Sequence, residues 1–153
     1  MRTYVIDSDV LISLYDNLPM EIYETQWNLL KTYISEGRIV ICEAVFNEIK
    51  KAEELKDWLS ELKEYVLPCY IREVIVEAKI IINDYPKLID INNSSDQSDP
   101  YVIALAKMGN YTVLTNESYG EGGKKTKIPF VCQKLSIDCI NTRKFYSEEN
   151  WKF

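Results

Sequence analysis

Short apolar runs alternate along this chain with segments in which apolar residues recur at helical spacing. The runs predict four buried strands, at residues 2–6, 38–41, 111–115 and 138–141. The clearest helical segment lies between the second and third runs, where an apolar stripe extends from Ile71 to Ile82. Because consecutive parallel strands are joined by long, usually helical connections, this alternation favours an α/β fold whose parallel sheet is covered by helices on both faces.

The chain has the length and composition of one globular domain. Its 153 residues, 46% of them hydrophobic, suffice for a core, and no repeat or linker divides them. We therefore expect a single domain over residues 1–153. No apolar run approaches the roughly 18 residues of a membrane span, and acidic residues interrupt the N-terminal apolar stretch within the first ten positions. We expect a soluble cytoplasmic protein without a signal peptide.

The chain contains no histidine. This absence excludes a Ser-His-Asp triad, a Cys-His pair and the imidazole pair that cleaves RNA without metal. It also disfavours a catalytic zinc site, which usually draws on histidine. The four cysteines, Cys42, Cys69, Cys132 and Cys139, are widely spaced beside apolar residues and are expected to be reduced core residues. Any hydrolysis must therefore rest on carboxylates, lysines, hydroxyls or oxygen-ligated metal ions.

Acidic residues stand near the ends of the predicted strands. Asp7 follows the first strand, Glu48 lies on the helix after the second, and Glu117 follows the third. Asp99 is predicted to cap the helix that leads into the third strand, with Pro100 as the first helical residue. Since open α/β sheets bind ligands outside the carboxyl ends of their strands, we expect these four acids to converge there.

A cluster of carboxylates is unfavourable unless shared protons or cations offset the repulsion. Oxygen ligands without histidine suit Mg²⁺ or Mn²⁺, and two such ions about 3.5–4 Å apart can promote hydrolysis of a phosphodiester. The net charge of −6 argues against nucleic-acid binding, but bound cations would neutralise part of that charge. Net charge therefore does not decide whether the chain acts on nucleic acid.

Three stretches of the chain occur in an order that matches a known family. They are Asp7-Ser-Asp-Val-Leu-Ile after an apolar strand, Glu48 in EAVFNEIKK, and Asp99 in SDPYVIALAKMGNYTVLTNE. In this order of motifs the chain resembles PIN-domain proteins, specifically their small prokaryotic toxin-like branch. The resemblance covers nearly the whole chain and includes the segment KIPFVCQKLSIDCIN. The resemblance implies a single-domain, three-layer α/β/α fold with a central parallel sheet of four or five strands. It also implies that Asp7, Glu48, Asp99 and Glu117 bind metal and carry catalysis.

The activity implied by the resemblance is that of a metal-dependent endoribonuclease. A carboxylate-bound Mg²⁺ or Mn²⁺ centre would hydrolyse RNA phosphodiester bonds. The toxin-like relatives further imply that the chain is the toxin of a toxin–antitoxin pair, with RNA as its substrate and with a cognate antitoxin and a second copy of the chain in a homodimer as partners. The residues themselves show neither protein partner.

Two positions depart from the family pattern. The fourth acid of PIN domains is commonly an aspartate, whereas this chain has Glu117, so the neighbouring Asn116 is an alternative contributor. Asp9 stands where the family is often uncharged, and it either supports Asp7 or caps the first helix. The role of Asp96 stays open.

Further polar residues are candidates for contacts with substrate. The hydroxyls of Ser8 and Thr115 lie next to the predicted acids, as does the side chain of Asn116. Lys124 and Lys125 belong to the segment GEGGKKTKIP, which directly follows the predicted fourth acid. This basic, glycine-rich segment either guides an RNA backbone or is an ordinary solvated loop.

The sequence is also compatible with two hypotheses other than a ribonuclease. Asp-x-Asp after an apolar strand also resembles the aspartyl nucleophile of haloacid-dehalogenase-type phosphatases. In those enzymes the final acidic pair follows a Ser/Thr strand end and a lysine, whereas here Asp96 and Asp99 precede the strand end VLTN. A PIN-like chain without metal would instead be a catalytically degenerate module that binds RNA or protein. A metal-binding measurement separates this module from an enzyme.

Overall fold

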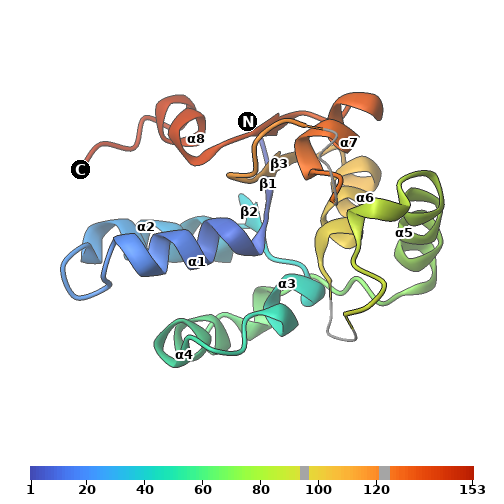
Figure 1. Ribbon diagram of the computed structural model, residues 1–153. Coiled ribbons are helices and arrows are strands. Elements are labelled where there is room, and N and C mark those ends of the chain that lie inside the picture. Colours follow the sequence, from blue (N-terminus) through green and yellow to red (C-terminus); the bar gives the residue numbers. More distant parts are fainter. Residues whose placement is uncertain (94–96, 121–124) are drawn as a thin grey trace.

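A computed structural model describes residues 1–93, 97–120 and 125–153 of the chain (Figure 1). Its centre is a sheet of four parallel strands in the order β2-β1-β3-β4. The strands are β1 (Tyr4–Ile6), β2 (Ile39–Val40), β3 (Thr112–Leu114) and β4 (Cys139–Ile140). The predicted strands and their parallel direction are thus confirmed, although each strand is shorter than the apolar run that contains it.

Helices cover both faces of the sheet. The α-helices are α1 (Ser8–Asn17), α2 (Glu24–Ser35), α3 (Glu43–Glu48), α4 (Glu53–Ser60), α5 (Arg72–Asp84), α6 (Asp99–Gly109), α7 (Ile128–Lys134) and α8 (Thr142–Glu148). The described residues also form the short 3₁₀ helices η1 (Lys63–Tyr65) and η2 (Pro86–Leu88). In Figure 1, α1, α2 and α8 lie on one side of the sheet and α5, α6 and α7 on the other, which confirms the predicted three-layer arrangement. Within the described residues, no helix has the length and apolar character needed to cross a membrane.

The register of the strands brings their carboxyl ends to one edge. Ile6 pairs with Leu114, and Leu114 pairs with Ile140. Just beyond these pairs, the N–H of Asp7 donates to the carbonyl of Leu114 (2.9 Å), and the N–H of Thr115 donates to the carbonyl of Ile140 (3.0 Å). Asp7 and Thr115 therefore leave the sheet at the same level, and α1 begins directly after Asp7.

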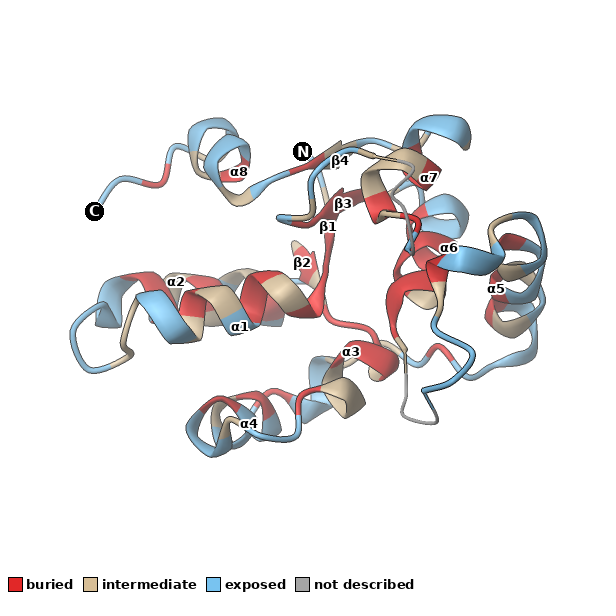
Figure 2. Cartoon of the chain, viewed as in Figure 1, coloured by how far each residue is buried: buried red, intermediate tan, exposed pale blue. Residues whose placement is uncertain are grey.

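The core lies around β1 and β3, whose side chains are all buried (Figure 2). Helix α6 contributes an unbroken buried run at residues 102–106. Such a run is expected where a helix packs between the sheet and another helix, here α5. Cys42, Cys69 and Cys132 are buried, and none of the four cysteines forms a disulfide. These three are core residues, as the sequence predicted, whereas Cys139 is partly buried and packs against the core.

One helix start differs from the prediction and matters for the site. Helix α6 begins at Asp99 itself, and Ser98 occupies the N-cap position. The prediction that Asp99 caps this helix was wrong, because the carbonyl of Ser98 already accepts the first helical hydrogen bonds, from Tyr101 N (3.0 Å) and Val102 N (3.0 Å). The Asp99 side chain is therefore not engaged in capping.

A carboxylate near the C-terminus joins α8 to the rest of the domain. Glu149 accepts hydrogen bonds from the hydroxyls of Tyr4 (2.7 Å) and Tyr33 (2.9 Å) and from Arg38 Nη2 (2.7 Å). The Glu149 and Arg38 side chains are 12% and 18% exposed, so water screens this ion pair only in part. Burial raises the pKa of Glu149, but the three donors outweigh it and hold that pKa below its usual range. The network ties the end of α8 to β1 and α2.

Replacing Glu149 by alanine should lower the free energy of unfolding by roughly 2–4 kcal/mol, because Arg38 and two hydroxyls lose their acceptor. Replacing the exposed Glu21 by alanine should change it by less than about 0.5 kcal/mol. Urea denaturation followed by circular dichroism measures both values. Equal effects of the two substitutions would contradict the importance of the network.

Candidate metal centre

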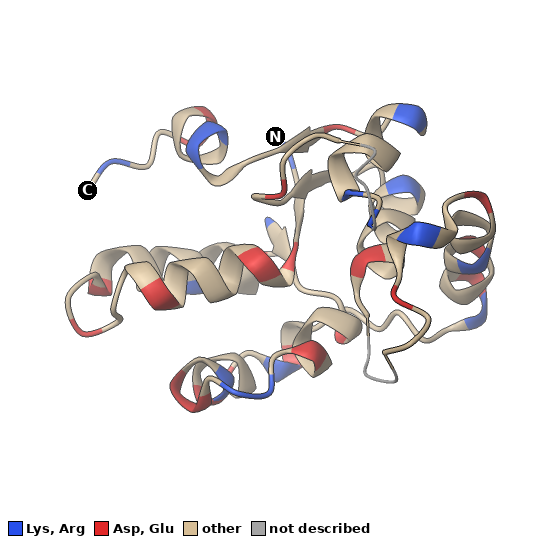
Figure 3. Cartoon of the chain, viewed as in Figure 1, with Lys and Arg blue, Asp and Glu red and all other residues tan. Residues whose placement is uncertain are grey.

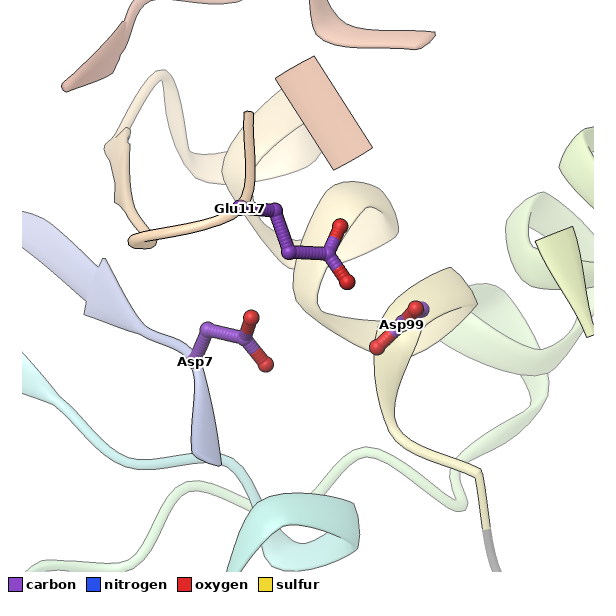
Figure 4. Close-up of side chains that lie close together, drawn as sticks. All are labelled: Asp7, Asp99 and Glu117. Carbon is purple, nitrogen blue, oxygen red and sulfur yellow. The ribbon is translucent and has the colours of Figure 1, made fainter. Parts of the chain in front are cut away.

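Three carboxylates from distant parts of the chain meet at the carboxyl edge of the sheet. Asp7 follows β1, Asp99 is the first residue of α6, and Glu117 lies in the segment after β3. One carboxylate oxygen from each lies within 4.8 Å of the other two. Figure 3 shows acidic residues gathered around this edge, and Figure 4 shows the three side chains pointing toward one another from separate elements. We call these three residues the acid cluster.

Asp7 is placed by the strand before it and oriented by a hydroxyl. Its side chain is buried and makes no hydrogen bond to the N-terminus of α1, although Asp7 occupies the N-cap position. Thr115 Oγ1 donates to Asp7 Oδ2 instead (2.8 Å). The hydroxyl of Thr115 is itself buried at the end of β3, so this bond fixes the orientation of the Asp7 carboxylate.

Glu48 lies beside the acid cluster but does not converge with it. Its Oε1 accepts a hydrogen bond from Ser8 Oγ (2.5 Å), and its Oε2 accepts one from Ser98 N (2.8 Å). Ser8 directly follows Asp7, and Ser98 directly precedes Asp99. One carboxylate at the end of α3 therefore joins the two segments that carry Asp7 and Asp99.

Of the neighbours Asn116 and Glu117, the glutamate faces the acid cluster. Glu117 Oε2 accepts a hydrogen bond from Ile128 N at the start of α7 (2.8 Å), and Oε1 lies 3.6 Å from Lys125 Nζ. Asn116 Oδ1 accepts hydrogen bonds from Thr142 N (3.0 Å) and Thr142 Oγ1 (2.9 Å). The Asn116 side chain therefore binds the start of α8, and it is Glu117 that joins Asp7 and Asp99.

Asp9 lies close to Asp7 in the first turn of α1. Its Oδ1 is 3.4 Å from Thr115 Oγ1, and it accepts a hydrogen bond from Asn116 N at 3.5 Å. The charge of Asp9 is one of the causes that raise the pKa of Asp7. Of the two roles predicted for Asp9, a place beside Asp7 matches this geometry, whereas the N-cap position belongs to Asp7.

Lys125 brings a positive charge to the acid cluster. Its Nζ lies 3.0 Å from Asp99 Oδ2 and 3.6 Å from Glu117 Oε1. Within residues 1–93, 97–120 and 125–153, no other lysine or arginine forms an ion pair with these acids. Asp96 and Lys124, which were also candidates, lie outside the described residues.

Two features of this site were missing from the sequence-based expectations. The first is Ser98, a buried residue whose N–H contacts Glu48. A serine before Asp-Pro is a common N-cap signal, and it could have placed the helix start one residue earlier. The second is the contact of Lys125 with the acids. No periodic pattern predicts the path of its loop, so no sequence signal reveals that contact.

Burial and mutual repulsion disfavour full ionisation of these acids. Burial, followed by the charges of Asp9 and Asp99, raises the pKa of Asp7 well above its usual range. Burial also raises the pKa of Asp99 to about 6, where the charge of Glu117 adds to the effect and that of Lys125 opposes it. Full ionisation of these acids would therefore give the neighbourhood more negative charge than Lys125 balances.

The acid cluster fits the divalent cation that the family resemblance implies. Its donors are carboxylate oxygens, the ligands preferred by Mg²⁺ and Mn²⁺. In the described part of the chain, the buried Asp99 Oδ2 accepts no hydrogen bond of regular geometry. Its ion-pair partner is the half-exposed ammonium of Lys125, at 3.0 Å. A bound cation would also oppose the repulsion that raises both pKa values. The cluster can therefore hold a divalent cation.

In the presence of a chelator, we expect the change that Asp99→Asn makes in the free energy of unfolding to be more stabilising at pH 7 than at pH 4. The expected difference between the two pH values is about 1–3 kcal/mol. The folded-state pKa of Asp99, about 6, exceeds the ordinary value of 3.8. Between these values Asp99 binds more protons in the folded state than in the unfolded state, so its contribution to wild-type stability falls as pH rises. The asparagine removes this loss. Urea denaturation at both pH values measures the difference, with the exposed Asp57→Asn as control. A pH-independent effect of Asp99→Asn would contradict the electrostatic account.

Comparisons with known proteins bear on the family and the fold of this chain. A family model described as "Domain of unknown function (DUF4411)" matches residues 4–153. No curated protein matches the sequence. A chain of VapBC2 from Rickettsia felis, solved bound to a DNA fragment from the promoter, is 14% identical over 91% of this chain and 98% of that chain, with a TM-score of 0.53. PAE2754 from Pyrobaculum aerophilum is 11% identical over 88% and 96%, with a TM-score of 0.43. The family model shows that the chain belongs to the DUF4411 family, and the likeness to the VapBC2 chain shows that the fold is PIN-like, as the resemblance implied.

Proposed function

We propose that this protein is a metal-dependent endoribonuclease that hydrolyses RNA phosphodiester bonds at the acid cluster. One observation carries the proposal, namely the convergence of Asp7, Asp99 and Glu117 at the carboxyl edge of a PIN-like sheet. That edge is where open α/β sheets bind their ligands. Because the chain has no histidine, carboxylates are the groups best placed to support hydrolysis at neutral pH.

In this proposal Asp7, Asp99 and Glu117 hold Mg²⁺ or Mn²⁺. When bound, such a cation supplies a Lewis acid that polarises a phosphoryl oxygen and activates water. The family pattern makes Glu48 a fourth ligand. Both of its oxygens accept hydrogen bonds from residues adjacent to Asp7 and Asp99, so we assign Glu48 the positioning of these two acids.

The remaining polar groups orient the acids and receive the substrate. Thr115 fixes the Asp7 carboxylate (2.8 Å), and Ile128 N fixes that of Glu117 (2.8 Å). Groups held in this way need little rearrangement when charge develops during hydrolysis. We propose that an RNA backbone at this edge contacts the ammonium groups of Lys124 and Lys125, which would offset the repulsion between phosphate and the acids.

A role as the toxin of a toxin–antitoxin pair is the finer part of the proposal. It rests on the likeness to toxin-like PIN proteins, and it is in keeping with the structural likeness to a chain of VapBC2. The partners proposed are a cognate antitoxin that covers the acid cluster and a second copy of the chain in a homodimer. The proposed catalytic unit is one domain, residues 1–153.

The alternative is a catalytically degenerate PIN-like module that binds RNA or protein. One observation favours this alternative. The ammonium of Lys125 already neutralises part of the acid cluster, as it would in a protein that needs no metal. The PIN-like fold leaves the haloacid-dehalogenase-type phosphatase without support.

Cleavage of labelled single-stranded RNA tests the proposed activity. The wild type should cleave the RNA in the presence of Mn²⁺ or Mg²⁺, and EDTA should abolish this cleavage. Asp99→Asn should slow cleavage by more than about 100-fold, because even a group that only orients a metal ligand is worth about 10–100-fold. The exposed Asp57→Asn should cut at the wild-type rate. If the folded wild type cuts none of several RNAs in either metal, the binding module replaces the enzyme.

A further inference from the structure

Lys125 occupies a position that a cation bound to the acid cluster would contest. Its Nζ lies 3.0 Å from Asp99 Oδ2 and 3.6 Å from Glu117 Oε1. A divalent cation bound to Asp99 Oδ2 at about 2.1 Å would lie within about 5 Å of an unmoved ammonium. Positive charges at that separation repel one another strongly in a site with little water. If the cation and the ammonium both contacted these two acids, their mutual repulsion would therefore weaken the binding of each.

The lysine is held less firmly than the acids. Its side chain is 47% exposed, whereas those of Asp99 and Glu117 are 12% and 14% exposed. Glu117 is fixed by the hydrogen bond from Ile128 N, and Asp99 begins a buried helix. Among the described residues, the side chain of Lys125 is held at the acid cluster by its ion pairs with Asp99 and Glu117 alone. Of the two partners, the ammonium is thus the one able to leave.

The surroundings allow Lys125 to leave by side-chain rotation. The next residue, Thr126, is buried, and its N–H donates to the carbonyl of Lys87 (3.0 Å). This bond holds the backbone beside Lys125 while its side chain turns. Lys125 also borders a hollow of about 570 Å³ lined in part by Lys87 and Asn92. An outward-turned ammonium has room there.

We propose that Lys125 is the exchangeable counter-ion of the metal centre. Its ammonium neutralises Asp99 and Glu117 in the metal-free protein and turns outward when a divalent cation binds. This inference rests on the proposed function, because it takes the acid cluster to be a metal site. It follows that each binding event must break an existing ion pair. Wild-type affinity for metal is therefore lower than the three acids alone would give.

Calorimetric titration of metal-stripped protein with MnCl₂ at low ionic strength tests the exchange. Lys125→Met should bind Mn²⁺ about tenfold more tightly than wild type, and Lys125→Arg should stay within about threefold of it. Lys127→Met is the matched control, because Lys127 lies on the same segment and forms no ion pair among the described residues. Its affinity should also stay within about threefold of wild type.

Thermal unfolding of the same proteins gives a second readout that needs no activity. In EDTA, Lys125→Met should unfold at a lower temperature than Lys127→Met, because the acids have lost their counter-ion. Saturating Mn²⁺ should abolish that difference. If wild type binds Mn²⁺ and Lys125→Met binds it equally or more weakly, the proposed exchange of Lys125 for the cation is wrong. The proposal that the acid cluster binds metal would not be affected by that result. If none of the four proteins binds Mn²⁺, the metal centre itself is wrong, and the exchange with it.

Discussion

The parallel pairing of β1 with β3 determines where the acids of this protein lie. Because Ile6 pairs with Leu114, Asp7 and Thr115 leave the sheet together, and Glu117 follows two residues later. Helix α6 packs against both strands, so its first residue, Asp99, reaches the same edge. Residues alternate between the two faces of a strand, and a shift of this register by one position would direct Asp7 elsewhere.

The fold keeps these acids close although their charges repel. Their positions are secured by neutral donors and by one bridging carboxylate: Thr115 orients Asp7, Ile128 N orients Glu117, and Glu48 joins the segments around Asp7 and Asp99. None of these bonds removes the negative charge. Functional sites typically hold like charges close together, an arrangement that lowers the stability of the folded protein but prepares the site to bind a ligand. Lys125 compensates only in part, and from the solvent side.

The sequence predicts the features that depend on local patterns. Apolar runs located the four strands, and the rule for the carboxyl ends of parallel strands located Asp7, Asp99 and Glu117 near one edge. Glu48 was predicted from the family pattern as a ligand, but its hydrogen bonds reach residues 40 and 50 positions away, and no local pattern encodes such contacts. The choice between Asn116 and Glu117 likewise depended on the distant start of α8.

The central claim is that Asp7, Asp99 and Glu117 form a divalent metal centre. A crystal structure of the protein grown in Mn²⁺, with anomalous diffraction data, tests it most directly. The account predicts an anomalous peak about 2.1 Å from a carboxylate oxygen of each acid, with Lys125 Nζ no longer in contact with Asp99. A well-ordered structure at saturating Mn²⁺ without such a peak, and with Lys125 still paired to Asp99, would contradict it.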